Sequence, residues 1–191
     1  PVAYLGAKLV FIDSNRETLN MDPEALKKAF QKYEALGKLP KAVIVVDLYG
    51  NSADYDKILP VCEQYGVPVV EDAAEALGST YNGKKCGTFG KIGILSFNGN
   101  KIITTSGGGM ALSDDEEAIK KIHFWSNQSK ENVNYYLHNE LGYNYRMSNI
   151  CAGIGRGQLK TLDDRLALRK RNYEFYKQAF KDLPVTMAPT T

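Results

Sequence analysis

Two short apolar stretches decide the fold: residues 42–47 read AVIVVD, and residues 67–71 read VPVVE. Apolar runs of this kind are typical of strands that are buried on both faces, as in parallel sheets. Between them, residues 55–65 have the pattern of a helix that ends at Gly66. Strand, helix and strand joined by short loops are the unit of an α/β fold with right-handed crossovers. The sequence therefore predicts a mostly parallel sheet flanked by helices.

The residues before this unit suggest one more strand and one more helix. Residues 8–12 (KLVFI) are expected to form a strand, after the end of a helix at 1–6. Asp22 and Pro23 then begin a helix, because Asp is a good N-cap and Pro is favoured at the first helical position. Gly37 fits the C-terminal end of that helix.

The pattern changes after Asp72, where the chain no longer alternates regularly between strands and helices. The Asn82-Gly83 pair suits a tight hairpin. Further elements are expected in this order: strands at 92–97 and 109–112, a helix at 115–125, an ordered polar excursion at 126–145, and helical structure at 148–191.

Composition excludes several classes of protein. A net charge of +2 without a dense basic run gives no nucleic-acid signal, and the basic residues at 165–171 have the pattern of a solvated helix face. No apolar run approaches the ~20 residues that span a bilayer, and residues 1–13 do not resemble a signal peptide. The three widely spaced cysteines fit neither a disulfide framework nor a metal site, so reduced thiols and a cytoplasmic location are expected. These are Cys62, Cys86 and Cys151.

Three acidic residues follow predicted strands, where open α/β sheets bind ligands. They are Asp47, Glu71 and Asp72. Asp72 is distinguished by Ala73 and Ala74 after it, since these small residues leave room for a flat ligand. The alternative is an acid that caps a helix or serves only the structure.

Lys101 is the second candidate, in the segment SFNGNKIITT at 96–105. Ser96 lies in the predicted strand at 92–97, and Lys101 lies among small polar residues in the loop that follows it. Three glycines come next, at 107–109. No Gly-Lys-Ser/Thr occurs, so the loop does not match a Walker phosphate site. The alternative is a solvated surface cation.

Together, these residues suit pyridoxal phosphate chemistry. A lysine that bonds covalently to a carbonyl needs a desolvated site, and a pyridoxal ring needs a fixed anion at its nitrogen. At an effective dielectric of ~20 and a distance of ~4 Å, a carboxylate contributes ~4 kcal/mol, or ~3 pKa units. Asp72 could supply the anion, Lys101 the covalent link, and the Ser96 hydroxyl a phosphate contact.

Three blocks of sequence resemble the signature blocks of the DegT/DnrJ/EryC1/StrS family. They are EDAAEALGS at 71–79, SFNGNKIITT at 96–105 and GYNYRMS at 142–148. Members of this family are pyridoxal phosphate (PLP)-dependent nucleotide-sugar aminotransferases of fold type I. The resemblance implies that residues 1–191 are part of the PLP-binding large domain. It also implies that an N-terminal part and a C-terminal small domain are missing, and that 148–191 leads toward the small domain.

The resemblance also implies roles for single residues around the cofactor. Asp72 would pair with the pyridinium nitrogen, Lys101 would bind the cofactor covalently, and Ser96 would bind its phosphate. Ala74 would pack against the ring, and Glu75 would lie near the ring hydroxyl.

Two residues of the third block are implied to act outside this group. Asn144 matches an asparagine that reaches across a homodimer interface to the phosphate of the neighbouring site. Arg146 would meet an anionic part of the substrate, with a structural ion pair as the alternative.

The sequence of the lysine loop, SFNGNKIITTSGGG at 96–109, resembles that of one branch of the family. Enzymes of this branch aminate C4 of nucleotide-linked 4-keto-6-deoxy sugars, with L-glutamate as the amino donor. Bacillosamine-type and perosamine-type enzymes belong to it, and Lys101 argues against a dehydratase branch with histidine at this place. The rival interpretation is a non-catalytic α/β binding or dimerisation fragment of receiver or flavodoxin type. That interpretation leaves the lysine loop and the Asn144 block unexplained.

Overall fold

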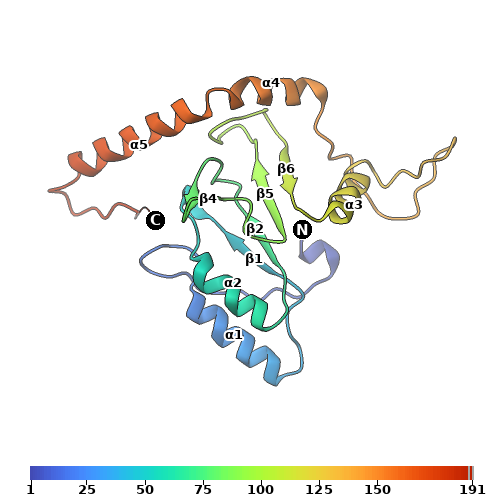
Figure 1. The fold of residues 1–191 in the computed structure, drawn as a ribbon, viewed down its shortest axis with the longest axis horizontal. Helices are drawn as coiled ribbons and strands as arrows, with labels where there is room; N and C mark the ends of the chain where they lie inside the picture. Colours follow the sequence, from blue (N-terminus) through green and yellow to red (C-terminus); the bar gives the residue numbers. More distant parts are fainter. Residues whose placement is uncertain (189, 191) are drawn as a thin grey trace.

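The computed structural model describes residues 1–188 and 190, and its centre is a four-stranded sheet in the order β1-β2-β5-β6 (Figure 1). The first three strands are parallel, and β6 runs antiparallel to β5. This confirms the predicted α/β fold with a mostly parallel sheet. The strands are β1 (Val43–Val46), β2 (Val69–Asp72), β5 (Ile92–Ser96) and β6 (Gly109–Leu112).

One face of the sheet is covered by α1 (Pro23–Ala35) and α2 (Tyr55–Gln64) (Figure 1). The Asp22 side chain caps α1 as predicted, by accepting a hydrogen bond from the N–H of Glu24 at 2.8 Å. Gly37 follows α1 with a φ of 63°, a left-handed conformation that favours glycine. The buried core on this face includes Leu26, Phe30, Val43, Val45, Ile58 and Val69.

The opposite face of the sheet is largely open in the described part of the chain. Because side chains alternate along a strand, Ile44 and Val46 point away from the helices, and they are 43% and 40% exposed. Burial of β1 on both faces was therefore a wrong expectation for these residues. No helix of residues 1–188 packs on that side to bury them. Asp72 and Ser96 belong to the same open face, since Asp72 pairs with Ile94 and Ser96 lies two residues further along β5.

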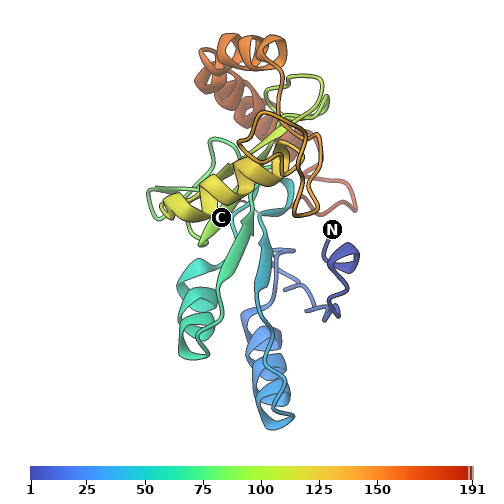
Figure 2. The same cartoon turned by 90° about the vertical axis from the view of Figure 1, so that its right-hand side faces the viewer.

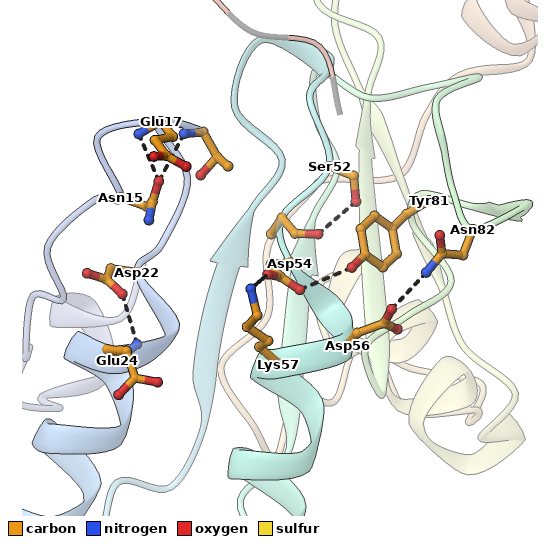
Figure 3. A network of polar contacts seen from close by, with 12 residues as sticks. Asn15, Glu17, Asp22, Glu24, Ser52, Asp54, Asp56, Lys57, Tyr81 and Asn82 are labelled. Atoms are coloured by element: carbon orange, nitrogen blue, oxygen red, sulfur yellow. Dashed lines mark hydrogen bonds and ion pairs between the residues drawn. The ribbon is translucent and has the colours of Figure 1, made fainter.

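The predicted tight hairpin is present as β3 (Thr80–Tyr81) and β4 (Lys84–Lys85). Asn82 and Gly83 both have positive φ, which suits a two-residue hairpin turn. The hairpin is tied to the start of α2 (Figure 3). The Tyr81 hydroxyl donates to Asp54 at 3.0 Å, and the Asn82 amide donates to Asp56 at 2.8 Å.

Of the helical structure predicted for 148–191, the part up to Ala179 is confirmed, residues 180–188 are not helical, and residues 189 and 191 lie outside the described residues. α3 (Glu116–Ser126) lies beside the sheet, and α4 (Asn149–Leu159) and α5 (Leu162–Ala179) run on from each other past the ends of the strands (Figures 1 and 2). The segment between α3 and α4 is ordered by isolated bridges such as Lys130 with His138. The basic residues at 165–171 are exposed, as expected of a solvated face. None of the described residues of α5 is buried, and its Phe175 is 67% exposed.

The predicted strand at residues 8–12 is wrong. The only regular structure near it is a short 3-10 helix, η1 (Ala3–Leu5), and residues 8–12 have no strand assignment. A strand is stable only when a neighbouring strand satisfies its backbone N–H and C=O groups. Among the described residues, no strand pairs with this segment, and its Phe11 is 88% exposed. The apolar composition of residues 8–12 was therefore not sufficient to predict a strand.

Two buried carboxylates, Glu71 and Asp47, accept hydrogen bonds in the interior beside β1 and β2. Glu71 accepts hydrogen bonds from the backbone N–H groups of Gly87, Phe89 and Gly90, in the turn that leads into β5. Asp47 accepts from the N–H of Ala53 and the hydroxyl of Tyr55 through Oδ1, both at 2.9 Å. Its other oxygen, Oδ2, is buried and has no hydrogen-bond partner among the described residues.

Three potential metal ligands meet in this interior. Ligand atoms of Asp47, Glu71 and Cys86 lie within 4.8 Å of one another, which is a spacing that could surround a cation. Burial, followed by the charge of Asp47, raises the pKa of the Cys86 thiol to about 12. Without a metal ion the thiol therefore stays protonated. The absence of a metal site stays a prediction. All three cysteines are free, and Cys151, unlike the other two, is only half-buried.

Burial raises the pKa of Asp47 to about 7, and the nearby charge of Glu71 adds to the effect. In the unfolded chain the same group loses its proton near pH 3.8. The free energy of unfolding should therefore fall between about pH 4 and pH 7, and this one group accounts for at most about 4 kcal/mol of the loss. The Asp47→Asn variant removes the titration, so its stability should depend less on pH in this range.

Urea unfolding at pH 5 and pH 8 tests this expectation. At pH 8, Asp47→Asn should be more stable than the wild type by about 1–3 kcal/mol, because the wild type then carries a buried anion. Asp114→Asn, at an exposed position, is the matched control and should behave as the wild type. The same pH dependence in Asp47→Asn and wild type would contradict the assignment of the proton to Asp47.

Candidate active site

The carboxyl ends of β2 and β5 bring two predicted site residues to one edge of the sheet. Asp72 is the last residue of β2, and Ser96 is the last residue of β5. The two strands are parallel neighbours, with Asp72 opposite Ile94. Ligands of open α/β sheets bind beyond such strand ends, so the predicted location of the site agrees with the topology.

Adjacent acids at the end of β2 have opposite surroundings. Glu71 is fully buried, and both of its oxygens accept backbone hydrogen bonds. Asp72 points to the open face, where it is only half-buried. Its Oδ1 accepts a hydrogen bond from the N–H of Ala74 at 3.1 Å, while Oδ2 accepts none from residues 1–188. Asp72 is thus the acid of the pair that remains able to meet a ligand.

Lys101 lies in the loop between β5 and β6, and its side chain is largely withdrawn from solvent. The loop begins and ends next to β5, because the N–H of Thr105 donates to the carbonyl of Phe97, and the N–H of Phe97 donates to the carbonyl of Gly108. The Lys101 side chain is 17% exposed. Its Nζ lies 3.4 Å from Oε1 of Glu75, whose side chain is 34% exposed. The structure therefore brings the lysine loop to the segment that follows Asp72.

Tyr49 is a residue of this site that the sequence analysis did not identify. It lies in the short helix η2 (Leu48–Gly50), which follows the end of β1. Its backbone N–H donates to Oε2 of Glu75 at 2.8 Å, so one carboxylate is shared by Tyr49 and Lys101. Tyr49 has a φ of 56°, a conformation that is uncommon for a residue other than glycine. The signal that could have identified it is the Leu-Tyr-Gly turn directly after a strand end.

The helices α4 and α5 pack closely on the segment that follows Asp72 and on the loop that carries Lys101. A Cβ atom on Gly78 would lie 2.6 Å from a methyl group of Leu166 in α5. A Cβ atom on Gly155 in α4 would lie 2.9 Å from the methyl group of Thr105. Both distances are far shorter than a normal carbon contact, so these glycines permit the approach.

The remaining predicted residues are distributed around and outside this group. Ala74 is half-buried, and the Ser96 hydroxyl accepts a hydrogen bond from the N–H of Asn98 at 3.4 Å. Asn144 is exposed and forms an isolated bridge with Asn127 in the excursion before α4. Arg146 is exposed as well, and within the described chain neither it nor Asn144 contacts Lys101, Glu75 or Asp72.

The whole chain, residues 1–191, matches the family model described as the DegT/DnrJ/EryC1/StrS aminotransferase family. EpsN of Bacillus subtilis, which carries the name of a pyridoxal phosphate-dependent aminotransferase, is 54% identical over 183 residues. These residues are 96% of this chain and 47% of EpsN. A GDP-perosamine synthase of Caulobacter vibrioides is 42% identical over 178 residues, which are 93% of this chain and 46% of that protein.

Among solved structures, the chain is similar to a DegT DnrJ EryC1 StrS aminotransferase from Brucella abortus, with a TM-score of 0.90 and 32% identity. This similarity covers 100% of this chain and 51% of that protein. The chain thus spans about half the length of the relatives that it matches. The large domain of a fold type I aminotransferase is the architecture that these similarities support.

Proposed function

Because this chain belongs to the DegT/DnrJ/EryC1/StrS aminotransferase family, we propose that it forms the cofactor-binding core of a nucleotide-sugar aminotransferase. In this proposal the enzyme transfers the amino group of L-glutamate to C4 of a nucleotide-linked 4-keto-6-deoxy sugar. The observation that carries the proposal is the position of Lys101, withdrawn from solvent and 3.4 Å from Glu75 at the strand edge that bears Asp72. The similarity to a GDP-perosamine synthase supports a nucleotide-linked sugar as substrate.

The residues at the strand edge fit pyridoxal phosphate, the cofactor of this family. A flat aromatic ring with a protonated nitrogen needs an anion with an unused oxygen, and Asp72 offers Oδ2 on the open face. A small side chain must flank such a ring, and the half-buried Ala74 lies two residues after Asp72. A primary amine must lie within reach and out of bulk water, which describes Lys101. When bound, pyridoxal phosphate supplies an aldehyde for the lysine and a ring that accepts an electron pair from the substrate carbon.

Each of these residues has a distinct task in the proposed reaction. Asp72 holds a positive charge on the ring nitrogen. The Nζ of Lys101 takes a proton from the amino donor and returns one to the sugar, as a general base and then a general acid. Glu75 fixes the Lys101 amine on one side and the Tyr49 backbone on the other. The Ser96 hydroxyl binds the phosphate end, where its present hydrogen bond of 3.4 Å to Asn98 is long and easily exchanged.

The proposal includes a homodimer with shared sites, and it gives Asn144 and Arg146 roles beyond their own chain's lysine. The exposure of Asn144 is consistent with contact to the partner's phosphate, and the exposure of Arg146 with contact to an anionic part of the substrate. Residues 1–191 are proposed to be part of the large domain, with 148–191 leading toward a small domain. A cytoplasmic location agrees with three free cysteines. No described helix is both long and apolar enough to cross a bilayer.

The assignment of Lys101 is tested by borohydride reduction of the complete protein with bound cofactor. Reduction should fix the pyridoxyl mass on the tryptic peptide that contains Lys101, because that amine is held beside Glu75 and is largely withdrawn from solvent. Peptide mapping by mass spectrometry gives the position. The Lys101→Ala variant is the control and should carry no label. A label on another lysine of the wild type would overturn the assignment.

The role of Asp72 predicts that Asp72→Asn retains some cofactor but loses turnover by about a thousandfold or more, because ~3 pKa units of ring protonation depend on the carboxylate. The amide is nearly isosteric, so folding should be preserved. Single-turnover kinetics with glutamate measure the effect, and the cofactor absorption spectrum serves as the check on binding. Near wild-type turnover in this variant would reduce Asp72 to a structural residue.

The role of Asn144 in the partner's site predicts complementation between two inactive variants. Lys101→Ala and Asn144→Leu homodimers should each be impaired, because every site then contains one defect. In a mixed dimer, one site combines both defects and the other is intact. An equal mixture that is unfolded and refolded should therefore recover roughly a quarter of wild-type activity, if pairing is random and the dimer is two-fold symmetric.

Each variant refolded alone is the control and should remain inactive. Native mass spectrometry establishes that mixed dimers have formed. An inactive mixture that contains mixed dimers would place Asn144 in its own chain's site or outside any site.

A further inference from the structure

One side chain of α4 holds the backbone of the lysine loop. The N–H of Thr104 donates to Oε1 of Gln158 at 3.1 Å, and Nε2 of Gln158 donates to the carbonyl of Thr104 at 2.6 Å. The planar amide therefore pairs with both polar groups of one residue, in the manner of a neighbouring strand. Thr104 and Gln158 are 54 residues apart in sequence, so this is a tertiary contact.

The other described hydrogen bonds of this part of the loop are mostly local. The Thr104 hydroxyl donates to the carbonyl of Phe97 at 3.1 Å and accepts from the N–H of Ser106 at 2.9 Å. The second contact from a distant helix joins Arg165 to the carbonyl of Ile102, and it is long at 3.5 Å. Gln158 thus supplies the two better-formed contacts that join the loop to a distant helix in the described chain.

The two hydrogen bonds between Thr104 and Gln158 are half-buried, so their loss would destabilise the loop. Without Gln158, the N–H and the carbonyl of Thr104 would both lose their partners where water has limited access, which is unfavourable for each group that remains unsatisfied. The loop would then move until these two groups of Thr104 reach water or new hydrogen-bond partners. Thr104 is three residues after Lys101, so such a movement would change the course of the backbone that carries the lysine.

We propose that Gln158 is a positioning residue for Lys101: its amide holds the loop so that the lysine amine stays beside Glu75. This inference rests on the proposed function, because it assumes that the Lys101 amine, which Gln158 of α4 helps to position, binds the cofactor. Gln158 itself contacts neither Glu75 nor Lys101 in the described structure, so it acts through the backbone at Thr104. Misplacement of a reacting group by ~1 Å can lower a rate by ~100-fold.

The test compares Gln158→Met with the wild type in the complete protein. Methionine has a similar length and volume but cannot make the two hydrogen bonds, so the helix and its packing are preserved. Arg156→Met is the matched control, since Arg156 is exposed on the same helix and has no polar side-chain contact among residues 1–188. Three quantities are measured: hydrogen exchange of the amides at 102–107, the rate at which added pyridoxal phosphate forms its visible absorption band with Lys101, and the affinity for pyridoxamine phosphate.

Gln158→Met should exchange the loop amides about tenfold faster and form the band about tenfold more slowly than the wild type. Its affinity for pyridoxamine phosphate should change less than twofold, because that compound binds without a link to lysine. Arg156→Met should match the wild type in all three. Unchanged exchange and an unchanged rate of band formation would overturn the inference, and so would an equal loss of pyridoxamine phosphate affinity, which indicates general damage to the site.

The proposed function fails separately, in the wild-type protein. A wild type that forms no band with pyridoxal phosphate would overturn the proposed function, and with it the role of the Gln158–Thr104 contact in catalysis. A wild type that forms the band, with a Gln158→Met variant that forms it at the same rate, would overturn only the role of Gln158. If Gln158→Met fails to fold, Gln158→Glu is the second variant: it retains the acceptor for the Thr104 N–H but sets a carboxylate oxygen against the Thr104 carbonyl, so it should show the same pattern.

Discussion

The buried carboxylate of Glu71 joins the strand that carries Asp72 to the turn that leads into the strand that carries Ser96. Three backbone N–H groups at Gly87, Phe89 and Gly90 converge on it. A buried carboxylate is costly unless such donors satisfy it, so the turn and β2 stabilise each other. β2 and β5 are parallel neighbours, and their register places Asp72 and Ser96 at one edge. Loss of the contact would therefore affect the site as well as the core.

The alternation of a strand then gives the two adjacent acids different tasks. Glu71 points into the covered face and is used by the structure, while Asp72 points to the open face and keeps one oxygen free of partners in the described chain. The strand end thus supplies an anchored interior and a ligand-facing anion from consecutive residues. The same principle applies to β1, where Asp47 is buried with a raised pKa and the following turn offers the backbone of Tyr49 to Glu75.

Three parts of the chain meet at the lysine loop. Glu75 lies beside the amine of Lys101, Phe97 bonds both ends of the loop directly after β5, and Gln158 of α4 bonds the loop backbone at Thr104. The close approach of the helices at Gly78 and Gly155 brings the C-terminal segment into this assembly. In a family of sugar aminotransferases, this arrangement links the helices α4 and α5 to the residue that is proposed to bind the cofactor.

The sequence by itself determined the elements whose signals are local. Apolar runs identified β1, β2 and β5, the Asp22-Pro23 cap identified α1, and Asn82-Gly83 identified the hairpin, because each depends on the preferences of a few neighbouring residues. It also identified the family, and with it Asp72 and Lys101 as candidates. Only the tertiary structure decided that residues 8–12 form no strand, since strand stability depends on a partner elsewhere in the chain. It likewise revealed the contacts of Tyr49 and Gln158, which join residues 26 and 54 positions apart, and such distances leave no local pattern to detect.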